Sequence, residues 1–152
     1  MTPLSSPYQT NGYNIPVIDN EEDVLDATKE YLSFTFSFTI DTAGSGEEAL
    51  AKIADTRYDA IISDYEMETM SGIDILKTIR ARGDDTPFII FTGRGREEVV
   101  IAAFENGADG YVMKGGSYFY TTDMVVQSCN NRCRSPLRSS EGASSAFSFH
   151  PE

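Results

Sequence analysis

Short apolar runs alternate with amphipathic stretches along the chain between about residue 15 and residue 131. The runs predict five strands, which lie at 15–18, 39–43, 58–63, 88–92 and 110–113. The stretches between them carry apolar residues at helical spacing and predict five helices, at 21–32, 45–54, 73–80, 96–106 and 117 to about 131. Because a helix follows every strand, this order favours an α/β fold in which helices cover both faces of a five-stranded parallel sheet.

Local signals at the ends of these elements make further predictions. Ser45 and Glu48, three residues apart, predict a capping box at the start of the second helix. Gly107 stands where a residue in the left-handed conformation would end the fourth helix. The inward face of that helix is expected to carry Val99, Val100, Ala103 and Phe104. Pro16 has no N–H to donate, so it should weaken the first strand.

The two ends of the chain differ in composition from the part between them. Residues 1–14 are uncharged and contain several helix and strand breakers, which predicts a flexible lead-in. Residues 132–152 hold six serines and a single aliphatic side chain, Leu137, which predicts a disordered tail. The expected single domain therefore covers residues 15–131, and the tail is too short to form a DNA-binding helix-turn-helix or an enzyme.

Charge narrows the function classes. The chain has 24 acidic against 12 basic side chains, for a net charge of -12, and this argues against a non-specific binder of nucleic acid or of anionic membranes. The acidity is compatible with a cation site or with basic protein partners. Since no apolar run approaches the length of a membrane span and the start of the chain does not resemble a signal peptide, we expect a cytoplasmic protein.

Cysteine and histidine are scarce. Cys129 and Cys133 are the only thiols, too few for a disulfide scaffold or a four-ligand zinc site. His150, the only histidine, stands two residues from the end of the chain. These counts argue against a Ser-His-Asp triad, a histidine-rich metal centre or a phosphohistidine relay within the chain.

Polar residues with complementary chemistry close the apolar runs. In a parallel sheet, ligands bind outside the carboxyl ends of the strands, so these residues should meet at one edge. They are Asp19, Asn20 and Glu21 after the first run, Asp64 after the third, Thr92 after the fourth and Lys114 after the fifth. Carboxylate and amide oxygens suit Mg²⁺, a lysine and a hydroxyl suit a phosphoryl group, and Asp64 is a candidate nucleophile. Each residue taken singly also has a purely structural explanation, as a cap, a turn or an exposed loop side chain.

Residues 15 to about 128 resemble the receiver domain of two-component response regulators, which has a flavodoxin-like (βα)5 fold. The resemblance rests on the 45-residue spacing from Asp19 to Asp64 and on three motifs: Asp64-Tyr65-Glu66-Met67 with Ser71-Gly72, Phe91-Thr92-Gly93, and Tyr111-Val112-Met113-Lys114. The stretches 42–50 and 92–99 further resemble a subset common in archaeal sensory proteins.

The resemblance implies a role for each matching residue. Asp64 matches the phosphoacceptor that takes a phosphoryl group from a partner histidine kinase, so the chain would be a phosphoprotein and not an enzyme, with slow self-dephosphorylation at most. Asp19, Asn20, Asp64 and the backbone carbonyl of Glu66 match the Mg²⁺ ligands. Thr92 and Lys114 match the residues that sense the phosphoryl oxygens, and Tyr111 matches an aromatic switch. The implied output is a protein-binding surface for an unknown downstream partner, with no nucleic acid and no membrane involved.

Some residues depart from the family pattern and leave alternatives open. Asn20 stands where a second acid is usual, while Glu68 and Gly115 replace usual prolines. These departures motivate a second hypothesis, a degenerate receiver that binds partners without phosphotransfer. A third hypothesis is a phosphohydrolase with Asp64 as nucleophile and Glu66 as the second acid two residues later, although no cap domain is apparent.

Overall fold

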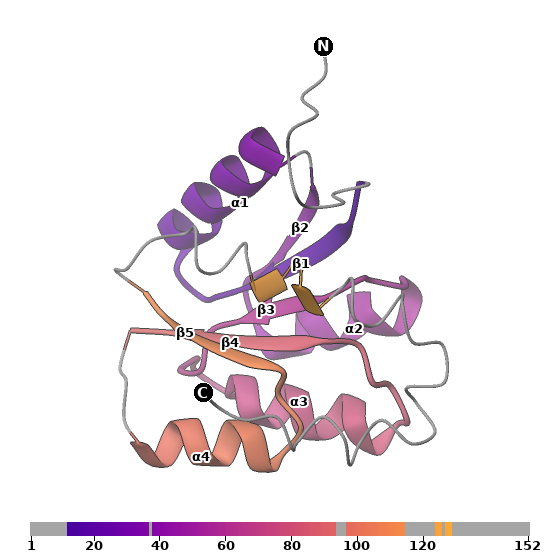
Figure 1. Cartoon of the computed structure of the whole chain (residues 1–152), viewed down its shortest axis with the longest axis vertical. Coiled ribbons are helices and arrows are strands. Elements are labelled where there is room, and N and C mark those ends of the chain that lie inside the picture. Colours follow the sequence, from indigo (N-terminus) through magenta and orange to yellow (C-terminus); the bar gives the residue numbers. More distant parts are fainter. Residues whose placement is uncertain (1–11, 37, 94–96, 115–123, 126, 129–152) are drawn as a thin grey trace.

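A five-stranded parallel sheet forms the centre of the molecule (Figure 1). The computed structural model describes residues 12–36, 38–93, 97–114, 124–125 and 127–128. The strands are β1 (Asn14–Ile18), β2 (Thr39–Ala43), β3 (Ile61–Ser63), β4 (Phe88–Thr92) and β5 (Gly110–Met113). Their order in the sheet is β2-β1-β3-β4-β5, and every neighbouring pair is parallel. The predicted α/β fold is therefore confirmed; four predicted strands match the observed ones to within one residue, whereas β3 begins at Ile61, three residues later than predicted.

Helices cover both faces of the sheet, as Figure 1 shows. The helices are α1 (Glu22–Phe36), α2 (Gly46–Asp55), α3 (Gly72–Ala81) and α4 (Glu97–Glu105). Helix α1 packs on one face over a cluster that includes Ile15, Val17 and Ile62. Helices α2, α3 and α4 pack on the other face over a cluster that includes Ile18, Ile61 and Ile90. Since neighbouring side chains of a strand point to opposite faces, the continuous apolar runs of β3 and β4 supply both cores.

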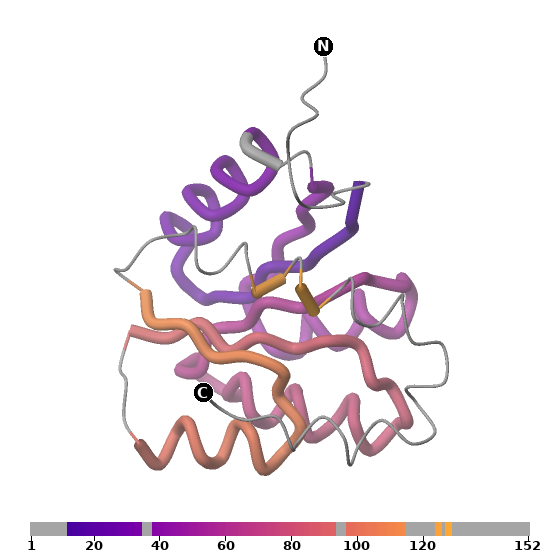
Figure 2. The backbone as a smooth tube through the Cα atoms, in the orientation of Figure 1, coloured from indigo at the N-terminus to yellow at the C-terminus, as the bar shows by residue number. Residues whose placement is uncertain are grey.

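Most of the predicted fifth helix lies outside the described residues. Residues 124–125 and 127–128 are helical (Figure 2). Val125 is fully buried and Met124 packs against the same cluster as α1. These residues therefore cover the α1 face of the sheet. In the part of the chain that the structure describes, no helix is long and apolar enough to span a membrane.

Pro16 lies in the middle of β1, a strand with a neighbour on each side. The ladder between β1 and β2 pairs all five residues of β1, whereas the ladder between β1 and β3 pairs only Val17 and Ile18. The missing N–H of Pro16 points toward β3, because the carbonyls of Asn14 and Ile18, two residues to either side, accept bonds from the N–H groups of Asp59 and Asp64. The proline is thus tolerated in a central strand, at the expense of the ladder on one side.

Helix caps differ in part from the predicted ones. Ser45 caps α2 as expected, with its Oγ accepting from the Glu48 N–H at 3.1 Å. The Glu48 carboxylate, however, accepts from the N–H of Gly44 at 2.9 Å and not from that of Ser45, so the predicted capping box is only half formed. A complete box starts α3, where Ser71 and Asp74 bond each other's backbone N–H.

Helix α4 shows one error in the predicted core. Val99 and Ala103 are buried as expected, but Phe104 is 44% exposed, so its predicted inward position is wrong. Residues 99 to 104 are all apolar, so the pattern alone does not identify one buried stripe. The stripe that contacts the sheet runs through residues four apart, and Phe104 lies beside it. Gly107 ends the helix with φ of +98°, which confirms its predicted role.

Candidate functional site

Asp19 and Asp64 stand next to each other at the carboxyl edge of the sheet. Asp19 follows β1 and donates its N–H to the carbonyl of Ala43 at the end of β2 (3.0 Å). Asp64 follows β3 and donates its N–H to the carbonyl of Ile18 at the end of β1 (2.8 Å). From β1 the chain continues to β2 on one side, while β3 lies on the other, so the two acids mark the point where the strand order reverses. Both are buried, with exposures of 1% and 5%.

Lys114 follows β5 at the same carboxyl edge, and its side chain reaches past the end of β4 to both acids. Its Nζ lies 2.8 Å from Oδ2 of Asp19 and 3.3 Å from Oδ1 of Asp64. The backbone N–H of Lys114 donates to the carbonyl of Thr92 at 2.7 Å, which extends the pairing of β5 with β4 by one bond. The ammonium also lies 5.9 Å from the ring centroid of Phe91, within the range of a cation–π contact. Three of the residues that the sequence places at this edge, Asp19, Asp64 and Lys114, therefore lie in contact.

Burial and neighbouring charges shift the pKa values of Asp64 and Lys114. Burial and the negative charge of Asp19 raise the pKa of Asp64 to about 6, although Lys114 acts to lower it. For Lys114, burial alone would lower the pKa, but its contact with Asp19 and the charge of Asp64 outweigh burial and leave the pKa raised. The lysine therefore stays positively charged, while the pKa of Asp64 is about 6.

The acid pair has the chemistry of a hard cation site. Asp19 Oδ1 accepts from the N–H of Glu21 at 2.9 Å. Its buried Oδ2 lies 2.8 Å from the Nζ of Lys114, an ion pair at hydrogen-bonding distance. Two buried carboxylates at one edge of the sheet fit a magnesium ion, which accepts oxygen ligands and keeps some of its waters. No group of three or more His, Cys, Asp or Glu side chains suited to a metal occurs in the described ranges.

The remaining predicted residues surround the pair at different depths. Asn20 and Glu66 are exposed, on the β1–α1 and β3–α3 loops. Thr92 is fully buried at the end of β4, and its carbonyl accepts the hydrogen bond from the Lys114 N–H. Tyr111 is half-buried against the cluster under α2, α3 and α4, and burial raises the pKa of its phenol.

Sequence reasoning assigned no role to Ser63 and Gly72, two residues that contact the backbone of Asp64. The Oγ of Ser63 donates to the Asp64 carbonyl at 2.9 Å, and Gly72 approaches the same oxygen so closely that an added Cβ would overlap it. Gly72 belongs to the Ser71-Gly72 motif on which the resemblance rests, whereas the only sequence signal for Ser63 is a polar residue at the end of an apolar strand.

The loop between β3 and α3 also rests on the first turn of α2. An added Cβ on Gly46 would lie 2.6 Å from Sδ and 2.8 Å from Cβ of Met70. Next to this contact, Thr69 donates to the carboxylate of Glu47 at 3.3 Å. The loop that carries Glu66 is therefore held at a second point besides α3.

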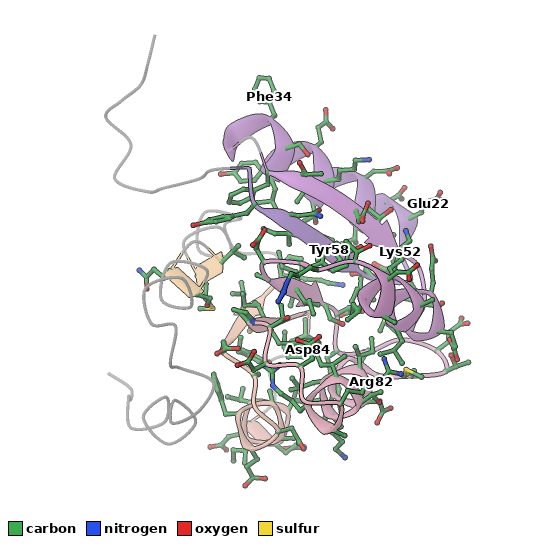
Figure 3. All side chains as sticks on the ribbon, turned by 90° about the vertical axis from the view of Figure 1, so that its right-hand side faces the viewer. Glu22, Phe34, Lys52, Tyr58, Arg82 and Asp84 are labelled. Carbon is green, nitrogen blue, oxygen red and sulfur yellow. The ribbon has the colours of Figure 1, made fainter. Side chains whose placement is uncertain are left out.

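Other exposed groups lie away from this edge. Phe34 protrudes from the last turns of α1 and is 88% exposed (Figure 3). A cavity of about 420 Å³, lined by Tyr58, Asp84 and nine other residues, opens between the end of α2 and the α3–β4 loop (Figure 3). This cavity lies at the opposite edge of the sheet from the acid pair, because its residues precede β3 and β4.

Comparison with known proteins places this fold and site in a family. Residues 15–118 match the family described as the response regulator receiver domain. The response regulator MprA of Mycobacterium ulcerans is 34% identical over 100 residues, which cover 66% of this chain and 43% of that protein. The chain thus spans less than half the length of this curated relative. MprA proteins of further mycobacteria are 33% identical, so these relatives do not support the resemblance to an archaeal subset.

Solved structures agree with this assignment. A receiver domain protein from Clostridium thermocellum has a TM-score of 0.75 and 28% identity, and the match covers 80% of this chain and 98% of that one. The response regulator TrrA of Thermotoga maritima, solved in complex with Mg²⁺-BeF, has a TM-score of 0.70 and 31% identity over 76% of this chain and 98% of its own. The chain belongs to the response regulator receiver domain family of two-component signalling.

Proposed function

We propose that this receiver domain accepts a phosphoryl group on Asp64 from a partner histidine kinase and thereby switches a protein-binding surface. The observation that carries the proposal is the position of Asp64 at the switch point of the sheet, where the ammonium of Lys114 contacts both Asp64 and Asp19. A buried carboxylate with one fixed cation beside it is a nucleophile whose product, an acyl phosphate, would be neutralised in place.

The proposed transfer breaks the bond from phosphorus to the kinase imidazole nitrogen and forms a bond from phosphorus to a carboxylate oxygen of Asp64. The residues of this chain position the reacting groups and neutralise their negative charge. Lys114 supplies a positive charge at the carboxylate, and the Thr92 side chain stands at the end of the neighbouring β4, where it can meet a phosphoryl oxygen. The new negative charge would then draw the end of β4 toward Asp64, and the half-buried Tyr111 would follow on the adjacent strand.

Magnesium would be held by Asp19, Asn20, Asp64 and the carbonyl of Glu66, and would supply charge neutralisation during the transfer. The burial of the Asp19 and Asp64 carboxylates at the same edge of the sheet supports this assignment. A solved relative, TrrA, is in complex with Mg²⁺-BeF, which supports Mg²⁺ as the ion. Asn20 contributes an oxygen without a charge, so we expect weaker binding than with a third carboxylate.

Phosphorylation by acetyl phosphate with Mg²⁺ tests the proposal. The intact mass should increase by one phosphoryl group in the wild-type chain and should not increase in Asp64→Asn. A mass gain that persists in Asp64→Asn would overturn the assignment of the phosphoacceptor, and no gain in the wild type would overturn the function.

Asn20 favours one alternative, a receiver that binds its partners without phosphotransfer. A titration of tyrosine fluorescence with Mg²⁺ separates the two hypotheses, because binding at millimolar or lower concentration supports the phosphoacceptor. The phosphohydrolase hypothesis requires a second acid directed at the substrate, but the side chain of Glu66 is exposed on the β3–α3 loop. We therefore propose that any loss of phosphate from Asp64 is slow self-dephosphorylation.

The proposal also covers the macromolecules that this domain would contact. A histidine kinase is the phosphodonor that two-component signalling supplies, and the downstream protein is unknown. The acidic charge of the chain still predicts no contact with nucleic acid through these residues. Since the relatives are longer than this chain, the prediction concerns this domain alone. A DNA-binding response regulator of the LuxR family from Staphylococcus aureus shares the fold at 22% identity.

A further inference from the structure

Two residues hold the carbonyl oxygen of Asp64. Ser63, the last residue of β3, is fully buried, and its Oγ donates to this oxygen at 2.9 Å. Gly72, the first residue of α3, packs against the same oxygen, and a Cβ at this position would overlap it. A glycine is therefore required here by the close approach of two backbones.

The backbone is also held at the peptide before Asp64 and at the carbonyl of the next residue, Tyr65. The N–H of Asp64 donates to the Ile18 carbonyl at 2.8 Å, and the N–H of Gly72 donates to the Tyr65 carbonyl at 3.0 Å. Strand β1 thus fixes the chain before the Asp64 Cα, while Ser63 and α3 fix it after. With both peptide planes fixed, the direction of the Cα–Cβ bond is fixed too, and it directs the carboxylate toward Lys114.

Ser63 is the one polar residue in β3, whose other members are Ile61 and Ile62. A buried hydroxyl is unfavourable unless it is hydrogen-bonded, and an apolar side chain would suit this fully covered position better for packing alone. The hydroxyl bonds the adjacent residue and not a distant element, so its effect is local to Asp64.

We propose that Ser63 and Gly72 are positioning residues for phosphoryl transfer to Asp64. This inference rests on the function proposed above. Without the Ser63 hydroxyl, the peptide after Asp64 can rotate, and the carboxylate loses its alignment with Lys114 and with the incoming phosphorus. Transfer depends on this alignment, because small displacements of a reacting group reduce rates by factors of ten to a hundred.

The matched pair Ser63→Thr and Ser63→Val tests the proposal. The two side chains have nearly the same shape and both suit a strand, but only threonine keeps the hydroxyl. We expect Ser63→Thr to be phosphorylated by acetyl phosphate and Mg²⁺ at a rate within about threefold of the wild type, and Ser63→Val to be slower by about tenfold or more. Thermal unfolding of both variants shows whether they fold.

Thr86→Val is the control for loss of a buried hydroxyl. Thr86 is buried and its Oγ1 donates to Asp84 at 2.6 Å, but it precedes β4 at the opposite edge of the sheet. This variant should lose stability and keep the wild-type rate of phosphorylation. An equal slowing in Thr86→Val would show that reduced stability explains the effect, and would overturn the proposal.

Further outcomes separate this inference from the proposed function. If the wild type is phosphorylated and the threonine and valine variants react at equal rates, Ser63 has no positioning role, although the function stands. If the wild type is not phosphorylated, the result contradicts both the positioning role and the proposed function. Should the branched variants not fold, Ser63→Ala adds no volume and is expected to react about tenfold more slowly than the wild type; an unchanged rate would contradict the proposal. For Gly72→Ala we expect a reduction of at least tenfold, and an unchanged rate would remove Gly72 from the pair.

Discussion

The ammonium of Lys114 lies 2.8 Å from the buried Oδ2 of Asp19, and this ion pair spans the ends of two intervening strands, β3 and β4. The same ammonium lies 3.3 Å from Oδ1 of Asp64. Its removal would leave two carboxylates facing each other with little solvent between them. Broken buried ion pairs are strongly destabilising, because the remaining charge has no partner.

We therefore predict that Lys114→Met lowers the free energy of unfolding by about 2–4 kcal/mol at pH 7.5 in the presence of EDTA. Urea titration measures this change. Lys77→Met is the matched control, since Lys77 is exposed on α3 and its loss should change stability by less than about 0.5 kcal/mol. Equal effects of the two substitutions would contradict a stabilising role for the Lys114 ion pairs.

The raised pKa of Asp64 predicts a pH-dependent effect of Asp64→Asn in the absence of Mg²⁺. The pKa in the folded state is about 6, above the ordinary value of 3.8, so the folded protein binds this proton more tightly than the unfolded chain. Ionisation of Asp64 therefore reduces stability: the reduction is absent below pH 4, grows between pH 4 and 6, and is complete above it.

Asparagine does not ionise, so Asp64→Asn should be more stable than the wild type at pH 7.5 by on the order of 2–3 kcal/mol, with little difference at pH 4. Urea titrations at the two pH values in EDTA measure both quantities. Added Mg²⁺ should stabilise the wild type more than the variant, because the variant lacks one of the proposed ligands. A stability difference that does not change with pH would contradict the raised pKa.

Tyr58 provides a prediction at high pH. Its hydroxyl donates to Oδ2 of Asp41 at 2.6 Å, and burial together with this bond raises the pKa of Tyr58 to about 12. The stabilisation is fully present below pH 10 and is lost as the pH rises through 12. Tyr58→Phe should lower the free energy of unfolding by about 1–2 kcal/mol at pH 8, with a smaller difference at higher pH.

Phenolate absorbance gives a second readout for Tyr58. In an alkaline titration of the folded protein, the wild type should show a component near pH 12 that is missing from Tyr58→Phe. If the substitution instead removes a component near pH 10, the bond to Asp41 does not hold the proton of Tyr58.

The contact between Gly46 and Met70 predicts an unusual cost for an alanine in a helix. Alanine normally stabilises a helix relative to glycine, but a Cβ on Gly46 would lie within 2.9 Å of three Met70 atoms. We predict that Gly46→Ala lowers the free energy of unfolding by about 1–3 kcal/mol. Met70→Ala in the same chain should recover part of that loss, and a double-mutant cycle measures the coupling.

Gly44→Ala is the control for this prediction. A Cβ on Gly44 would meet only Glu48, at 3.8 Å, which is an ordinary contact. Its effect should stay within about 0.5 kcal/mol of zero. If Gly46→Ala is equally harmless, the β3–α3 loop does not rest on α2.

The sequence was sufficient to predict the sheet and the acid pair, for reasons that particular residues make clear. β2 and β4 were predicted with their observed bounds, because Thr39–Ala43 and Phe88–Thr92 are bounded by turn residues and are rich in strand formers. Asp19, Asp64 and Lys114 were predicted to meet because the carboxyl ends of parallel strands share one edge. That geometry follows from strand order alone and needs no knowledge of side-chain packing.

Some of the features that were missed depend on how elements approach one another. The contacts of Gly72 with the Asp64 carbonyl and of Gly46 with Met70 arise only when the helices pack. The half-formed capping box at Ser45 depends on Glu48 finding a nearer N–H at Gly44. Phe104 was misplaced because an entirely apolar stretch has no polar residue to mark the exposed side.

Pro16 affects where the sheet is most easily separated. The ladder between β1 and β3 is the shortest of the four, with two paired positions, so it forms a seam between the half of the sheet that carries α1 and the half that carries α3 and α4. Asp19 and Asp64 stand on opposite sides of this seam. A cation or phosphoryl group that contacts both acids would link the two halves of the sheet across this seam. Amide hydrogen exchange at Ile18 and Asp64 would therefore slow when the ligand binds. Ligand binding and the separation of the two halves of the sheet are in this way coupled: a bound ligand favours the state in which β1 and β3 stay paired.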